Sequence, residues 1–210
     1  MTRRTLATGL GATVVVAVAA GCSGGPVAAP ASSAPVPASS AAALPHSGAP
    51  KVERPLPASV LSGPPCQEAL TSDQLKQIFG MVPQGKPDTL PGIGPECDWS
   101  NIDAGAGLGI YYATQPRQGL SGLYQNTKPR SKLWRELSPI QGFPAVASSS
   151  VSAGDKNGFC QVSVGITDES SVDVSLTPSD AKLAAGVDPC VLSERVAGMV
   201  VTNLKRKAGA

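Results

Sequence analysis

Residues 160–177 read CQVSVGITDESSVDVSLT and carry the clearest fold signal in the chain. Apolar residues occupy alternate positions in both halves of this stretch: Cys160, Val162, Val164 and Ile166, then Val172, Val174 and Leu176. Alternation places one set of side chains on each face of a strand, so each half is predicted to be a β-strand. Thr167–Ser170 supplies the turn, and an antiparallel hairpin with one buried face is expected.

The segment after the hairpin predicts a long helix. Asp188 is a suitable N-cap, and Pro189 is favoured at the first helical position. Apolar residues then fall on one stripe: Leu192, Val196, Val200 and Leu204. The basic residues 205–207 suit the negative end of such a helix.

Earlier segments predict shorter elements. Thr71 or Ser72 caps a helix that ends at Gly80, and a weaker helical stretch lies near 120–126. Strands are expected over 97–101 and 108–113. The fold class is therefore α+β, with an antiparallel sheet of about five strands packed by two or three helices.

Four of the five cysteines lie in this part of the chain: Cys66, Cys97, Cys160 and Cys190. An export signal, described below, implies an oxidising compartment, in which two disulfides form with three possible connectivities. We favour pairing in sequence order, Cys66 with Cys97 and Cys160 with Cys190, which joins each flanking segment to its neighbouring strand. No pair has the spacing of a zinc site, so no metal is expected.

Several motifs follow one another in order: a cysteine before the leading helix, Cys97-Asp98-Trp99, Gly142-Phe143-Pro144-Ala145-Val146, Cys160 opening a strand, and Asp188-Pro189-Cys190. This order, over about residues 60–204, resembles the actinobacterial lipoproteins grouped as domain of unknown function 3558. The resemblance implies an exported, lipid-anchored domain. The family has no assigned activity, so no catalytic residue is carried over.

The N-terminus is typical of an export signal, because Arg3 and Arg4 precede the uncharged, mostly apolar stretch 6–20. Ala19-Ala20-Gly21-Cys22 resembles a bacterial lipobox, although Ala19 stands where leucine is usual. We expect residues 1–21 to be removed and Cys22 to be lipidated. An ordinary signal peptide is the alternative, and the export route, general or twin-arginine, stays open.

Residues 22–64 are expected to be the lipidated cysteine and a disordered tether. The stretch 23–50 has no acidic or basic residue and is almost entirely Ala, Ser, Pro and Gly, too little apolar surface to fold. His46 is then a solvated linker residue. A single extracytoplasmic domain is expected over 65–205, and a tail over 206–210.

Charge and residue types argue against two function classes. The 17 basic residues fall to 15 when Arg3 and Arg4 are removed, which equals the 15 acidic ones, so no field attracts nucleic acid. Ser-His and Cys-His catalysis needs a histidine, and the chain has only His46. Asp98, as well as Asp168 and Glu169 in a turn, can act as acid and base in principle, but the turn residues are expected to be solvated.

Two further motifs resemble functional ones. Ser179-x-x-Lys182 has the spacing of penicillin-recognising enzymes but lacks their companion motifs. We interpret it as a short helix that Thr177 caps, that starts at Pro178 and that ends at Gly186. The glycines within 105–109 lack the flanking strand and helix of a phosphate loop and indicate a hairpin.

One basic and aromatic patch remains as a candidate interaction site: Lys128, Arg130, Lys132, Trp134 and Arg135. Such a patch can contact lipid phosphates, an acidic wall polymer or a protein. The alternative is a solvated face with one packed tryptophan.

We therefore expect a protein anchored by lipid to the extracytoplasmic side of the cell membrane. It is expected to be a non-enzymatic binding or interaction module without a cofactor, with an envelope protein, lipid or wall component as its partner. A small-molecule or lipid-binding protein, including a solute receptor, is the alternative, and a hydrolase that uses carboxylates is a weaker one.

The anchor can be tested with Cys22→Ala. The variant is expected to leave the membrane fraction, because two acyl chains are what hold the protein there. Fractionation followed by immunoblotting measures this, and circular dichroism serves as the folding control. A variant that stays on the membrane would show that the anchor lies elsewhere.

Overall fold

The computed structural model describes residues 43–151 and 158–210. The α-helices of this part are α1 (Pro65–Glu68), α2 (Ser72–Phe79), α3 (Gly119–Asn126), α4 (Asp180–Ala184) and α5 (Pro189–Ala208). The 3-10 helices are η1 (Ala58–Leu61), η2 (Ile102–Ala104) and η3 (Lys128–Arg130). The strands are β1 (Lys86–Leu90), β2 (Gly94–Asn101), β3 (Ala106–Ala113), β4 (Leu133–Ile140), β5 (Phe143–Ser149), β6 (Cys160–Thr167) and β7 (Ser170–Thr177).

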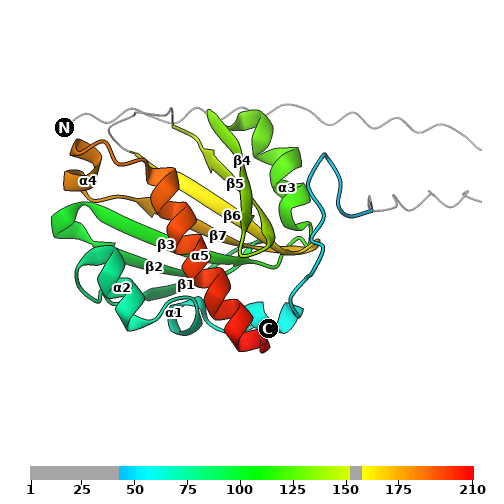
Figure 1. Cartoon of the computed structure of the whole chain (residues 1–210), viewed down its shortest axis with the longest axis horizontal. Helices are drawn as coiled ribbons and strands as arrows, with labels where there is room; N and C mark the ends of the chain where they lie inside the picture. The colour runs from blue at the N-terminus through cyan, green and yellow to red at the C-terminus, as the bar shows by residue number, and fades with distance from the viewer. Residues whose placement is uncertain (1–42, 152–157) are drawn as a thin grey trace, which may run out of the picture. The chain divides into compact units, whose positions relative to one another are not determined.

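The strands form one antiparallel sheet in the order β1-β2-β3-β7-β6-β5-β4 (Figure 1). The predicted hairpin is β6–β7, near the middle of the sheet, where Val162 pairs with Val174 and Val164 with Val172. The α+β class is confirmed. The sheet of the described residues has seven strands, where about five were expected.

Two strands that were not predicted, β1 and β5, lack the period of two that marks a half-buried strand. β5 reads FPAVASS and is buried along its length except at Pro144, so it shows no apolar-polar alternation. β1 is exposed over four of its five residues and sits at the edge of the sheet. Neither strand can be recognised from periodicity.

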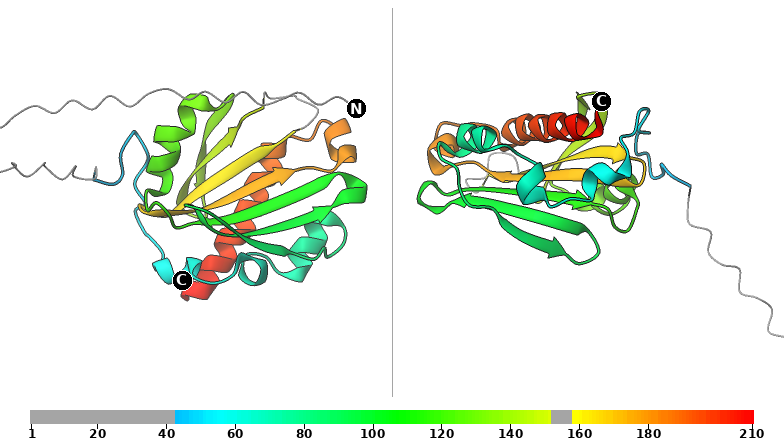
Figure 2. Two further views of the ribbon diagram at one scale, coloured as in Figure 1. Left: turned by 180° about the vertical axis from the view of Figure 1, so that it is seen from behind. Right: turned by 90° about the horizontal axis from the view of Figure 1, so that it is seen from below.

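α5 lies across one face of the sheet, over β6 and β7, and α2 lies on the same side (Figures 1 and 2). Val196, Val200 and Leu204 are at most 3% exposed, as the apolar stripe predicts. The carboxylate of Asp188 accepts a hydrogen bond from the backbone N–H of Cys190 at 2.8 Å and caps the helix. α3 packs at the other end of β6, where Leu120 contacts Gly165.

Two disulfides staple these layers, and both join cysteines in sequence order. Cys66–Cys97 links α1 to β2, and Cys160–Cys190 links the first residue of β6 to the first turn of α5. Between them, α2 begins at a capping box of Thr71 and Gln74 and ends at Gly80, whose φ of 79° suits glycine.

The folded part begins before Pro65, which corrects the expected boundary of the tether at 64. Val52, Leu56, Val60 and Leu61 are between 2% and 7% exposed and belong to the core. The backbone N–H of Leu56 also donates to the carbonyl oxygen of Ile166 at 3.2 Å. Single apolar residues spaced by prolines bury individually against the sheet, which average composition does not reveal. The expected tether residues 22–42, with Cys22, lie outside the described residues.

His46 and the C-terminal residues belong to the same folded part. The backbone N–H of His46 donates to Ser121 Oγ at 2.9 Å, so this histidine is not in a free linker. α5 continues to Ala208, which corrects the expected tail from 206. Lys207 Nζ donates to the carbonyl oxygen of Val60 at 3.1 Å and to Glu68 Oε2 at 2.6 Å, which fixes the last turn.

Leu61→Ala tests whether the segment before Pro65 is part of the core. Removing this side chain, which is 2% exposed, is expected to lower the free energy of unfolding by about 2–4 kcal/mol. Urea unfolding measures the change, and Ser59→Ala, an exposed position of the same helical turn, is the control with less than about 0.5 kcal/mol. Equal stability of the two variants would place Leu61 outside the core.

Candidate functional site

The predicted basic and aromatic patch is centred on a packed tryptophan. Trp134 meets Tyr124 of α3 edge to face, with ring centroids 5.0 Å apart. Lys128 Nζ lies 4.7 Å from the Tyr124 centroid and 5.5 Å from the Trp134 centroid, and it pairs with Glu136 at 3.2 Å. Burial, with a smaller contribution from the charge of Glu136, raises the pKa of Tyr124 to about 12. Lys128 is therefore already engaged by its own neighbours.

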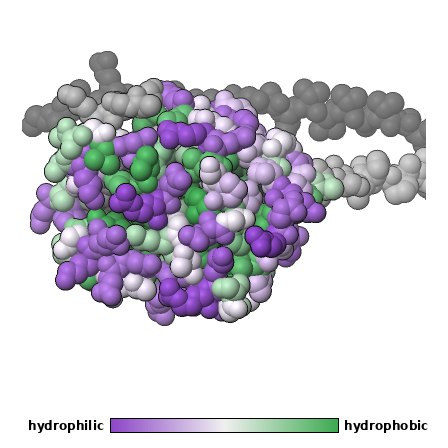
Figure 3. Space-filling view, viewed as in Figure 1, coloured by the Kyte–Doolittle hydropathy of each residue, from purple (hydrophilic) through white to green (hydrophobic). Residues whose placement is uncertain are grey.

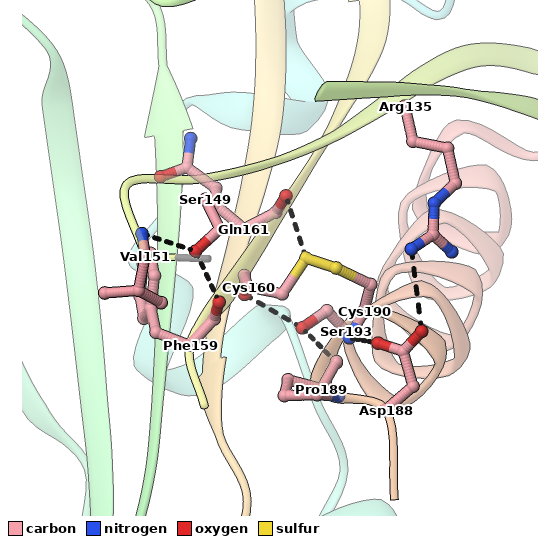
Figure 4. The surroundings of a disulfide bond; sticks show 10 residues. All are labelled: Arg135, Ser149, Val151, Phe159, Cys160, Gln161, Asp188, Pro189, Cys190 and Ser193. Atoms are coloured by element: carbon pink, nitrogen blue, oxygen red, sulfur yellow. Dashed lines mark hydrogen bonds and ion pairs between the residues drawn. A yellow bond between two sulfur atoms is a disulfide. The ribbon is translucent and has the colours of Figure 1, made fainter. Parts of the chain in front are cut away.

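The rest of the patch does not join this cluster. Successive residues of a strand point to opposite faces, so Arg135 faces away from Trp134. Its guanidinium lies 3.5 Å from the carboxylate of Asp188, beside the Cys160–Cys190 disulfide (Figure 4). Arg130 and Lys132 are exposed, the first in η3 and the second just before β4. The structure thus places Arg135 on the other face of the sheet from Trp134 and Lys128.

The residues with enzyme-like spacing have structural roles. Ser179 is the N-cap of α4, where its Oγ accepts a hydrogen bond from the backbone N–H of Lys182 at 3.4 Å. The expected cap, Thr177, was therefore wrong, and the helix begins at Asp180 and not at Pro178. Lys182 Nζ donates instead to the carbonyl oxygen of Ile78 at 3.3 Å. Asp168 accepts from the backbone N–H of Val52 at 2.8 Å.

The remaining candidates are similarly placed. Glu169 pairs with Arg117 at the surface, and residues 105–109 form the turn and start of the β2–β3 hairpin, as expected. Among the described residues, no three His, Cys, Asp or Glu side chains are grouped as a metal would require.

The sheet face opposite α5 brings together polar side chains that are far apart in the sequence. The register aligns Glu96 with Tyr111, and Tyr111 with Asp173. Asp173 is buried and accepts from Ser171 Oγ at 3.0 Å. Burial raises the pKa of Asp173 to about 6, and burial together with the nearby charge of Asp98 raises the pKa of Glu96.

An apolar groove opens on the α5 side of the sheet, between α2, α4 and the first half of α5. Its floor is Leu176 at the end of β7, with Ala106 and Gly107 of β3 beside it. Its walls are Ile78 and Phe79 of α2, and Leu192, Val196 and Met199 of α5. The cavity measures about 390 Å³, within the range of about 300–1,000 Å³ that is usual for small-molecule sites.

The apolar surface of the groove reaches solvent. Ile78, Phe79, Leu192 and Met199 are only partly buried against the core. Three exposed apolar side chains lie within two positions of lining residues in the sequence: Met81 and Val82, each 50% exposed, and Ile102, 85% exposed. Figure 3 shows apolar surface among hydrophilic side chains in the region of α2, α4 and the start of α5. Exposed apolar residues that are grouped in this way often mark a binding site, whereas single scattered ones do not.

The groove is apolar inside and basic at its rim. Lys182 and Arg195 are the charged side chains of its lining, and both are exposed. Sequence reasoning missed this site, because it described residues 192–204 only as the apolar stripe of a helix and did not consider that part of the stripe could line a groove. A signal was present, since Arg195 follows Leu192 by three residues and so falls on that apolar stripe.

Comparison with known proteins assigns a family but no activity. The sequence model of the family described as protein of unknown function DUF3558 matches residues 17–203. No curated protein and no solved structure matches the chain. Within residues 43–151 and 158–210, no helix has the length and apolar character needed to cross a bilayer.

Asp173 is expected to make stability fall as the pH rises. The folded chain holds this proton up to a pH of about 6, whereas the unfolded chain releases it near 3.8, so the folded state binds the proton more strongly. As the pH rises between these two values, the folded chain loses the stabilisation that this proton provides. Above them, the free energy of unfolding is lower by about 3 kcal/mol.

Asp173→Asn removes that titration. Urea unfolding at pH 4 and pH 7.5 is expected to show the variant gaining about 1–3 kcal/mol on the natural chain at the higher pH. Asp103→Asn, an exposed position in η2, is the control. A difference between natural chain and variant that is the same at both pH values would contradict the assignment.

Proposed function

The chain belongs to the DUF3558 family of proteins of unknown function, a description that assigns no activity, and we propose that it is a binding module of the cell envelope. The module is lipid-anchored through Cys22 on the extracytoplasmic side of the membrane and catalyses no reaction. It holds the apolar chain of a small amphipathic molecule in the groove between α2, α4 and α5. Of the functions considered above, we therefore favour a lipid-binding protein over a module that binds its partner through a flat surface.

The groove is the observation that carries the proposal. Its cavity of about 390 Å³ is bounded by Ile78, Phe79, Leu192 and Met199, which the fold leaves partly exposed. Each methylene that moves from water into such surroundings contributes about 0.8 kcal/mol. A hydrocarbon chain therefore supplies the contacts that these side chains lack.

The residues around the groove support binding rather than catalysis. Among the residues that the structure describes, the lining includes no carboxylate, thiol or imidazole, and the hydroxyl of Ser179 serves as a helix cap. The buried acids Glu96 and Asp173 lie on the other face of the sheet.

Small residues keep the groove open, which provides the test. Ala106 lies on the same face of β3 as Leu108, beside the floor of the groove. Ala106→Phe is expected to fill the space and to weaken binding of dodecanol at least about tenfold, which corresponds to loss of about two buried methylenes. Isothermal titration calorimetry below the micelle concentration measures the affinity.

The matched control is Ala184→Phe, an exposed position on α4 outside the lining. It is expected to bind dodecanol like the natural chain, and a melting curve of each variant checks folding. The proposal fails if the natural chain does not bind dodecanol, or if Ala106→Phe binds it unchanged.

A further inference from the structure

We infer that the ligand of the groove carries an anionic head group, and that Arg195 binds it with Lys182 at its side. This inference rests on the proposed function and names the class of ligand: an amphiphile with one apolar chain that ends in a carboxylate or a phosphate. Three observations about the rim of the groove support it.

The first observation is the position of Arg195 on its helix. The α5 residues that line the groove are Leu192, Arg195, Val196 and Met199, which follow the spacing of one helical face. The other three are apolar, so Arg195 is the charged residue on a helix face that is otherwise apolar. Its long side chain can pack along the apolar wall and still hold the guanidinium at the mouth.

The second observation is that the charged side chains lining the groove, among the described residues, are both basic: Lys182 and Arg195. Neither Arg195 nor Lys182 has an ion-pair partner among the described residues. The acids nearest in sequence, Asp180 and Glu194, are absent from the lining, although the Asp180 carboxylate lies against Gly105, next to the lining residues Ala104 and Ala106. The two positive charges of the described lining favour an anion over a neutral or cationic group at the mouth of the cavity.

The third observation concerns Lys182, which is held at the rim rather than free in solvent. Its Nζ donates to the carbonyl oxygen of Ile78, in the last turn of α2, at 3.3 Å. An ammonium group has three donors, so two remain for a ligand. Arg195 adds a planar fork of N–H donors that matches a carboxylate or a phosphate in two parallel hydrogen bonds.

An apolar cavity with a cationic mouth selects ligands by both ends. A neutral alcohol fills the cavity but leaves the two cations unpaired. An anion of the same chain length gains the charge-assisted hydrogen bonds as well. A cationic amphiphile is repelled at the mouth.

The test compares probes that share one chain and differ in the head group: dodecanoate, dodecyl phosphate, dodecanol and dodecylammonium. Calorimetry on the natural chain, below the micelle concentration of each probe, is expected to show both anions binding about fivefold or more tightly than dodecanol. Dodecylammonium is expected to bind more weakly than dodecanol. The stronger of the two anions identifies the source of the head group, a free carboxylate or a lipid phosphate.

Arg195→Gln tests the contribution of the positive charge separately from that of the ligand's hydrocarbon chain. It is expected to remove most of the advantage of the anions over dodecanol. The readout is the ratio of the two affinities within the same variant, so that a change in the apolar wall, which affects all probes alike, does not enter. The matched control is Arg206→Gln, which removes an exposed arginine from the same helix outside the groove and is expected to keep the full advantage. Lys182→Gln, with a smaller loss expected, provides a second variant at the rim.

The outcomes are distinct. Equal affinities for dodecanoate, dodecyl phosphate and dodecanol in the natural chain would overturn the head-group inference and leave the groove as a binding site. An advantage of the anions that survives both Arg195→Gln and Lys182→Gln would also overturn it. Failure of dodecanol to bind would instead overturn the proposed function itself.

Discussion

The packing of α5 against β6 and β7 holds the other parts of the domain in place. Val196, Val200 and Leu204 are almost completely buried against strands whose inward residues are valine and isoleucine. The Cys160–Cys190 disulfide fixes the start of the helix on the start of β6. Lys207 fixes its last turn on the segment before Pro65. Both ends of the helix are therefore attached to other parts of the domain, and these attachments set the position of the segments that contact it.

The groove follows from that fixed position. The first half of α5 runs beside the end of α2, and the two helices are separated by residues with small or no side chains, Ala104, Ala106 and Gly107. A close-packed interior fills such space with side chains, and here the fold does not. Apolar side chains of both helices are left partly exposed as a result. The charged residues that this domain places at the mouth are both basic.

The two faces of the sheet carry different chemistry because strand residues alternate. The α5 face takes the apolar set and forms the core, whereas the opposite face aligns Glu96, Tyr111 and Asp173 in one row across three strands. Burial shifts the pKa values of these two acids upward in the same direction. The predicted patch around Trp134 was divided by the same alternation, because Trp134 and Arg135 are neighbours in the chain and therefore opposed on the strand.

Local patterns in the sequence determined the α+β class, the β6–β7 hairpin, the caps of α2 and α5, and the apolar stripe of α5. These features depend on residues close together in the chain, so periodicity and capping chemistry are sufficient to predict them. The export signal and the lipidated Cys22 are also predictions of local sequence, and they lie outside the described residues. Only the tertiary structure decided that Val52, Leu56 and Leu61 belong to the core, that Lys128 and Arg135 lie on different faces, and that Arg195 stands at the mouth of a groove. Each of these depends on segments that are distant in sequence, and their meeting is set by how helices and strands pack, which no local pattern encodes.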